Sequence, residues 1–153
     1  MIKVLFVCLG NICRSPMAEA VFAWQVRQAG LDHKIECDSA GTGRWHLGEQ
    51  PHMGTRHILD LNGIPWNHRA REITEKDLKE FDYIIPMDRT NEFDIRSMEF
   101  PAARIALLMA FAPEMGVEEV PDPYYTGGFD EVYELVQKGA SGLLAEIRKE
   151  HSL

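Results

Sequence analysis

The feature that most constrains the fold is a nearly continuous apolar run over residues 2–7, which leads directly into Cys8. Such a run is typical of a central parallel strand that is covered on both faces. A helix is expected soon after it, because Ser15 can cap a helix and Pro16 suits its first turn. Gly30 is expected to end that helix. A buried strand that passes into a helix predicts a parallel sheet, with a ligand site beyond the carboxyl ends of its strands.

The rest of the chain continues this alternation of strands and helices. Apolar patterns predict further strands over 35–40, 83–87 and 105–108, and helices over 55–61, from 74, over 89–98 and from 129 onward. The segment 113–128 shows no clear pattern, and a loop of that length in a small domain is often functional. We therefore expect one α/β domain over residues 1–153, with three layers: a four-stranded parallel sheet and helices on both of its faces.

Bulk properties narrow the class of partner. The 153 residues carry a formal net charge of −8, which disfavours binding to nucleic acid or to an anionic membrane surface. No apolar run approaches the roughly 20 residues of a membrane span, and the first residues lack the layout of a signal peptide. The three cysteines do not suggest a disulfide-stapled scaffold, so we expect a cytoplasmic protein. An anionic ligand would need a positive site built locally.

The segment from Cys8 to Arg14 can build such a site. Gly10 and Asn11 tolerate backbone angles that let successive N–H groups converge on an anion. The N-terminus of the following helix and the Arg14 guanidinium add positive charge, and the planar guanidinium can bind two phosphate oxygens at once. These surroundings favour the thiolate form of a cysteine, which is its nucleophilic form. Ser15 could then donate a hydrogen bond to the Cys8 sulfur.

A plainer interpretation makes Cys8 a buried core thiol, Arg14 a surface residue and Gly10 a turn residue. The position of the motif, after a strand and at the start of a helix, favours the catalytic interpretation. Neither a nucleotide-binding glycine motif nor cysteine–histidine spacing for a metal is present, so we expect no cofactor and no metal.

With these residues the chain resembles the low-molecular-weight protein tyrosine phosphatases. Residues 8–16 are similar to the phosphate-binding loop of that family. The likeness extends along essentially the whole chain through further landmarks in the family's order: 38–42, Trp45-His46, Met87-Asp88 with Asn91, and 122–125. The resemblance implies a flavodoxin-like, phosphotyrosine phosphatase I-like fold and the hydrolysis of phosphotyrosine or aryl phosphates.

The resemblance also implies a role for each matching position. Cys8 would be the nucleophile, Arg14 the phosphate clamp, Asp122 the general acid and base, and Ser15 the donor to the thiolate. The remaining assignments are substrate contacts by Leu9, Gly10, Asn11, Ile12, Cys13, Trp45, Tyr124 and Tyr125, and support of the loop by Asn11, Ser39 and His68. Cys13 would also form a reversible disulfide with Cys8 under oxidation. Implied partners are a phosphotyrosine protein or aryl phosphate, and inhibitory phosphate or other oxyanions, on a mostly monomeric protein.

Independent chemistry supports Asp122, because a carboxylic acid can protonate a departing phenolate and its carboxylate can then activate water. Alone, an Asp-Pro pair is more often a turn. Trp45, Tyr124 and Tyr125 could be exposed loop aromatics, but their place beside an anion site favours contact with an aromatic substrate. His68 is expected to support the loop and not to act as a base. Cys37 is expected to be a packed, inert thiol.

Two other functions compete with hydrolysis. Arsenate reduction uses a similar thiolate loop, but its thioredoxin-coupled form needs further cysteines downstream, and none follows Cys37. A catalytically silent phosphotyrosine-binding module would be expected to lack the nucleophile or the acid. Cys8, Arg14 and Asp122 are all present, which favours an active hydrolase.

Overall fold

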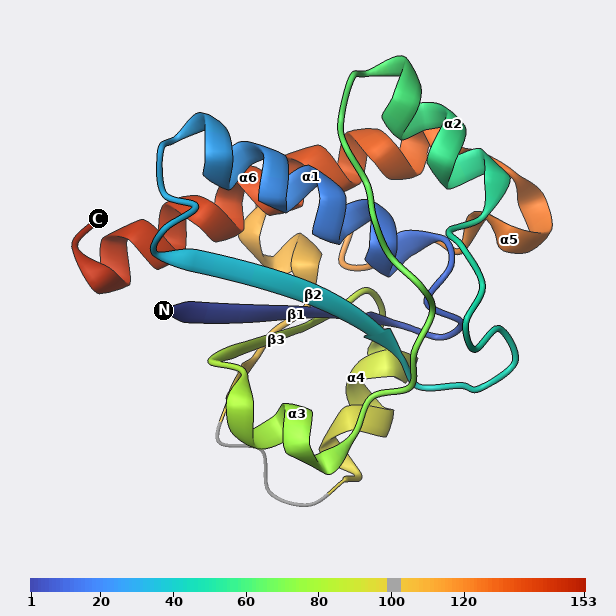
Figure 1. Ribbon diagram of the computed structural model, residues 1–153, viewed down its shortest axis with the longest axis horizontal. Helices are drawn as coiled ribbons and strands as arrows, with labels where there is room; N and C mark the ends of the chain where they lie inside the picture. Colours follow the sequence, from blue (N-terminus) through green and yellow to red (C-terminus); the bar gives the residue numbers. More distant parts are fainter. Residues whose placement is uncertain (99–102) are drawn as a thin grey trace.

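The computed structural model describes residues 1–98 and 103–153, which fold around a parallel sheet. The described strands are β1 (Ile2–Cys8), β2 (Ile35–Gly41), β3 (Tyr83–Pro86) and β4 (Arg104–Ile105), in the order β2-β1-β3-β4. Figure 1 labels the first three of them. Cys8 pairs with Gly41, and Val7 pairs with Pro86. The ends of β1, β2 and β3 therefore meet at one edge, and the expected four-stranded parallel sheet is confirmed.

Helices cover both faces of this sheet. One face carries α1 (Arg14–Gln28), α2 (Met53–Leu61) and α6 (Phe129–His151), and the other carries α3 (Glu75–Glu80) and α4 (Arg89–Arg96) (Figure 1). The described part of the chain is thus the three-layer α/β arrangement that the sequence predicts. No helix within it is long and apolar enough to cross a membrane.

Strand β1 is buried on both sides, as its unbroken apolar run predicts. Val4 and Phe6 belong to the core cluster that packs beneath α1 and α6, and Leu5 and Val7 belong to the cluster on the opposite face. All four side chains have no exposed surface. Burial of each stabilises the fold by roughly 1.5–3 kcal/mol, which fixes the end of β1 as a rigid platform for Cys8.

Two helix ends follow the sequence prediction and one does not. Thr74 and Asp77 form a capping box at the start of α3, where a helix is predicted from residue 74, and Gly30 adopts a φ of +71° just beyond α1. Ser15 does not cap α1, which begins at Arg14 without a side-chain cap. The Ser15 hydroxyl instead lies 3.0 Å from the Cys8 sulfur. The hydroxyl that was expected to cap the helix therefore faces the loop.

The predicted strand over 105–108 is also wrong in extent. Strand β4 ends at Ile105, and a 3₁₀ helix, η1 (Leu108–Phe111), follows it. Leu108 is fully buried, and a Cβ atom at Gly139 of α6 would lie only 2.6 Å from its Cγ. The chain turns here because Leu108 packs closely against α6.

The segment 113–128 contains more regular structure than its sequence suggests. It holds a 3₁₀ turn, η2 (Pro113–Met115), and one helical turn, α5 (Pro123–Thr126). Asp122 is the N-cap residue of α5. The predicted functional loop therefore presents Asp122 from a defined local structure. Helix α4 ends at Arg96, so Met98 lies just beyond it.

Candidate active site

The loop after β1 wraps around the Cys8 sulfur at the carboxyl edge of the sheet. The Asn11 N–H points to this sulfur at 3.3 Å, and Cys8 is only 2% exposed. The start of the loop is fixed to the segment after β2, because the N–H groups of Thr42 and Gly43 donate to the carbonyls of Cys8 and Leu9, each at 2.9 Å. The sulfur thus lies inside a backbone cradle of the kind that binds anions.

Asn11 holds this loop in shape. It has a φ of +57°, in the left-handed region that asparagine tolerates better than most residues, as predicted. Its Nδ2 donates to Ser15 Oγ at 2.8 Å and to Ser39 Oγ at 3.1 Å. Its Oδ1 lies 2.7 Å from His68 Nε2 and accepts from the Arg71 N–H at 3.0 Å. The structure therefore brings together the three residues named as loop supports.

Glu19 completes this support and was not predicted. Its Oε1 accepts a hydrogen bond from Ser39 Oγ at 2.6 Å and lies 3.1 Å from His68 Nδ1. Together with Asp38, Glu19 and His68 place ligand-type atoms within 4.8 Å of one another, as a metal site would. Asp38 also pairs with Arg71 at 3.1 Å. Since each of the three groups already has a protein partner, we interpret them as the rigid backing of the loop.

The glycines at and beside this loop matter because they have no side chain, and not because their φ angles are positive. Gly10 does not have a positive φ, contrary to the expectation from sequence. A Cβ atom there would lie 3.1 Å from the His46 ring, so the missing side chain gives room to His46. At Gly41 a Cβ atom would lie 2.7 Å from the Leu9 carbonyl oxygen, which explains how β2 approaches the loop so closely.

Arg14 is the positive centre of the site. It is 3% exposed, and its Nη1 donates to Asp88 Oδ2 at 2.6 Å and to the Val120 carbonyl at 2.9 Å. Its Nη2 lies 3.6 Å from Asp122 Oδ2. Burial opposes its charge, but Cys8, Asp88 and Asp122 outweigh burial and raise the pKa of Arg14. The guanidinium is therefore a permanent cation beside the sulfur.

The two carboxylates on Arg14 have different positions. Asp122 lines the pocket, where its Oδ1 accepts from the Tyr124 N–H at 3.0 Å. Asp88 does not line the pocket and caps α4 through a reciprocal pair of hydrogen bonds with Asn91. No role for Asp88 was predicted from the sequence. Its place directly after β3, at the edge where Cys8 lies, is the signal that could have identified it.

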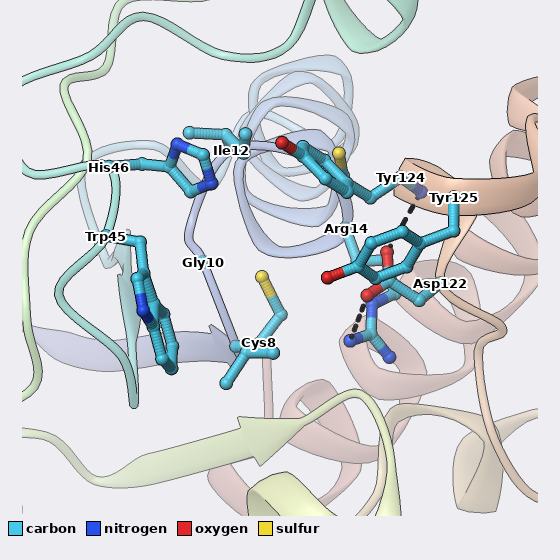
Figure 2. A pocket seen from close by; sticks show the side chains of 11 residues that line it. Cys8, Gly10, Ile12, Arg14, Trp45, His46, Asp122, Tyr124 and Tyr125 are labelled. Carbon is cyan, nitrogen blue, oxygen red and sulfur yellow. Dashed lines mark hydrogen bonds and ion pairs between the residues drawn. The ribbon is translucent and has the colours of Figure 1, made fainter.

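Aromatic side chains form the mouth of the pocket, which has a volume of about 380 Å³. Trp45 and His46 lie on one side of the Cys8 sulfur, and Tyr124 and Tyr125 lie on the other (Figure 2). Trp45 is 73% exposed and Tyr125 is 82% exposed, so both are open to an incoming ring. The pocket therefore joins an anion-binding floor to aromatic walls. His46 is a further wall residue, for which no role was predicted from the sequence.

The other two cysteines differ from Cys8 in their surroundings. Burial, followed by the negative charges of Cys8 and Asp122, raises the pKa of Cys13 to about 12 despite the nearby Arg14. Cys13 therefore stays a protonated thiol at neutral pH, and it lines the pocket beside Cys8. Cys37 lies in β2, where its thiol donates to the Glu19 carbonyl at 3.5 Å. Burial raises its pKa as well.

This fold, with a thiol held inside an anion-binding loop and beside a buried arginine, defines a cysteine-dependent enzyme that acts on a phosphate-like oxyanion. The model of the family of low molecular weight phosphotyrosine protein phosphatases matches residues 3–153. The low molecular weight protein-tyrosine-phosphatase YfkJ of Bacillus subtilis is 50% identical, with all of both chains covered. PtpA of Staphylococcus epidermidis is 44% identical over all of this chain and 98% of its own. The chain belongs to this family.

Solved structures agree with this assignment. The crystal structure of YfkJ superposes with a TM-score of 0.95, covering 98% of this chain and 96% of its own. A protein tyrosine phosphatase from Entamoeba histolytica superposes with a TM-score of 0.93 at 36% identity, with all of both chains covered. A Drosophila arginine phosphatase, 33% identical, superposes with a TM-score of 0.91 over 96% of this chain and 98% of its own. The predicted family and fold are thus confirmed.

Proposed function

We propose that this protein hydrolyses phosphotyrosine and other aryl phosphates in two steps through a phosphocysteine intermediate. The observation that carries the proposal is the shared pocket of Cys8, Arg14 and Asp122 beneath aromatic walls. The loop N–H groups and Arg14 would bind the three equatorial phosphate oxygens, on which charge is spread in the transition state. The walls formed by Trp45 and Tyr125 would hold the substrate ring.

In the first step the Cys8 sulfur attacks phosphorus, and the bond from phosphorus to the tyrosyl oxygen breaks. Asp122 donates its proton to that oxygen, so that tyrosine leaves as a neutral phenol. Asp122 Oδ2 lies 3.6 Å from Arg14 Nη2. Bound phosphate competes for the same guanidinium, which frees the carboxyl group to face the leaving oxygen.

In the second step water attacks the phosphorus of the phosphocysteine and Cys8 leaves as a thiolate. The Asp122 carboxylate accepts the proton of that water. Ser15 Oγ, 3.0 Å from the sulfur, stabilises the departing thiolate by a hydrogen bond. The products are inorganic phosphate and the original enzyme, and phosphate in excess would inhibit by occupying the same loop.

A substrate panel tests this function. We expect rapid turnover of phosphotyrosine and p-nitrophenyl phosphate, little turnover of phosphoserine or phosphoarginine, and no thioredoxin-dependent reduction of arsenate. Phosphoserine carries no ring for the aromatic walls, and no cysteine follows Cys37 to relay electrons from thioredoxin to arsenate. Phosphate release and NADPH oxidation measure the two chemistries. Robust arsenate turnover, or a preference for phosphoarginine, would contradict the proposal.

We also propose that the protein works as a monomer in the cytoplasm and is sensitive to oxidation. The three cysteines are free thiols, as a reducing compartment would keep them. Peroxide would oxidise the Cys8 thiolate to a sulfenic acid. The Cys13 thiol would then attack that sulfur and release water, forming a disulfide that an added thiol reduces.

The oxidation proposal predicts a difference between native protein and Cys13→Ser. After a brief peroxide treatment, dithiothreitol should restore most activity of the native protein. Recovery in Cys13→Ser should be several-fold lower, because its sulfenic acid has no neighbouring thiol and oxidises further to an irreversible sulfinic acid. Activity before peroxide provides the reference for each protein. Equal recovery in the two proteins would exclude the protective disulfide.

A further inference from the structure

A second depression borders the catalytic pocket. It has a volume of about 670 Å³ and lies between the segment after β2 and the start of α2. Ile12, His46 and Tyr124 line both cavities and form their common wall. These three side chains lie along one rim of the catalytic pocket (Figure 2). We call this depression, with Arg56 and Arg69 in its lining, the basic groove.

The positive charges of Arg56 and Arg69 in the basic groove are not neutralised by ion pairs, because neither arginine pairs with a carboxylate among the residues that the structure describes. Arg56 donates through Nε to the Pro51 carbonyl at 2.9 Å, and its guanidinium lies 6.0 Å from the centre of the Trp66 ring. The two terminal nitrogens of Arg56, Nη1 and Nη2, make no hydrogen bond among the described residues. Arg69 is exposed and makes one long contact, 3.5 Å, to the Gly48 carbonyl.

Negative charge in the groove is limited. Glu49 is the carboxylate of its described lining, and its Oε2 lies 2.9 Å from His46 Nδ1. In a chain with a net charge of −8, two arginines without ion pairs beside the catalytic pocket form a local exception to the acidic surface. Such a site attracts a negative group against the field of the whole molecule.

The wall between the cavities is held in place by ring contacts. The Tyr124 ring centroid lies 5.7 Å from that of His46 and 5.8 Å from that of His52, and His52 stacks on Phe129 at 5.0 Å. An extended peptide advances about 3.3–3.6 Å per residue. A peptide that leaves the pocket across this wall would therefore bring its next few residues into the groove.

From this geometry we propose that the basic groove is a specificity subsite. It takes an anionic side chain close to the phosphotyrosine of a substrate protein, either a carboxylate or a second phosphate. The inference rests on the proposed hydrolysis of phosphotyrosine and narrows its substrate class to phosphotyrosine in an acidic context. Arg56 and Arg69 would bind the anion, and neither takes part in the chemistry at Cys8.

Matched phosphotyrosine peptides test the subsite. Each peptide carries one glutamate, at one of the three positions before or after phosphotyrosine, and its partner carries glutamine there. We expect kcat/KM to favour glutamate about threefold to tenfold at the best position, as two partly exposed ion pairs allow. A phosphoserine at that position should give a larger preference than glutamate. The preference should shrink as salt is added.

Variants connect that preference to the groove. Arg69→Gln and Arg56→Gln should each reduce the glutamate preference, and the double variant should bring it close to one. The matched control is Arg148→Gln, an exposed arginine near the end of α6, which should keep the native preference. Turnover of p-nitrophenyl phosphate, which does not reach the groove, provides the reference for each variant. If Arg56→Gln fails to fold, the exposed Arg69 still decides the question.

Failure of the subsite and failure of the proposed function give different results. Native protein that hydrolyses phosphotyrosine peptides without favouring glutamate at any position overturns the subsite alone. Native protein that hydrolyses neither peptide nor p-nitrophenyl phosphate overturns the proposed function. Peptide affinities of Cys8→Ser, measured by fluorescence anisotropy, then decide the subsite separately. Equal affinity for glutamate and glutamine peptides would overturn it.

Discussion

Replacement of Cys8 by serine is expected to abolish hydrolysis of aryl phosphates while phosphate binding persists. The sulfur is the one group at the centre of the loop, with the Asn11 N–H at 3.3 Å and Ser15 Oγ at 3.0 Å. A serine hydroxyl in its place stays protonated at neutral pH, and Asp122, which must donate its proton to the leaving oxygen in this step, cannot also accept the serine proton. Loss of an enzyme's nucleophile lowers kcat by several powers of ten, here on the order of 10⁴-fold or more.

The binding half of this prediction follows from the rest of the loop. Arg14 and the loop N–H groups remain in Cys8→Ser. Arg14 still donates to Asp88, and the carbonyl of residue 8 still accepts from the Thr42 N–H, since neither hydrogen bond involves the sulfur. Steady-state release of phosphate measures the loss of turnover, and titration calorimetry with inorganic phosphate measures the binding that remains. Thermal unfolding confirms that the variant is folded.

Cys37→Ser is the matched control for this experiment. Its thiol lies in β2 with the Glu19 carbonyl as partner and lines no wall of the catalytic pocket. We expect its kcat to stay within about twofold of the native value, because a conservative change away from the site removes no transition-state contact. Turnover by Cys8→Ser within tenfold of native would show that another group attacks phosphorus.

The parts of the site that sequence could predict are those fixed by local rules. A continuous apolar run predicted that β1 is buried on both faces, and the end of such a strand in a parallel sheet is where ligands bind. The left-handed backbone of Asn11 was predictable because few residues tolerate that region. The place of Asp122 opposite Arg14, across more than a hundred residues of sequence, followed only from the family resemblance.

The sequence predictions are wrong or incomplete where contacts between residues distant in sequence override the local conformational preference of a residue. Serine is a common N-cap residue, but the Ser15 hydroxyl is instead hydrogen-bonded to Cys8 and Asn11. Those two partners come close to it only when the loop is folded. Leu108 continues an apolar run, but its packing against α6 ends the strand at Ile105. The role of Glu19 depends on Ser39 and His68, which come from separate segments, so no pattern along the chain reveals it.

Asp122→Ala is expected to slow hydrolysis in proportion to how poor the leaving group is. Asp122 lines the pocket at the N-cap of α5, with one oxygen held by the Tyr124 N–H at 3.0 Å. Removal of a general acid costs on the order of 10²- to 10⁴-fold when the leaving oxygen needs a proton. Phenyl phosphate should therefore lose most of its rate, whereas p-nitrophenyl phosphate, which releases a much weaker base, should lose far less. The slope of log kcat/KM against the leaving-group pKa is the measurement.

Asp88→Asn separates this role from simple support of Arg14. Both carboxylates contact the guanidinium, Asp88 at 2.6 Å and Asp122 at 3.6 Å, but only Asp122 lines the described pocket. Loss of Asp88 weakens the hold on Arg14, and so it should slow all leaving groups by a similar factor and leave the slope unchanged. A steeper slope in Asp122→Ala alone would assign proton transfer to Asp122. An unchanged slope in Asp122→Ala, or equal slopes in the two variants, would contradict that assignment and leave Asp122 as a second support of Arg14.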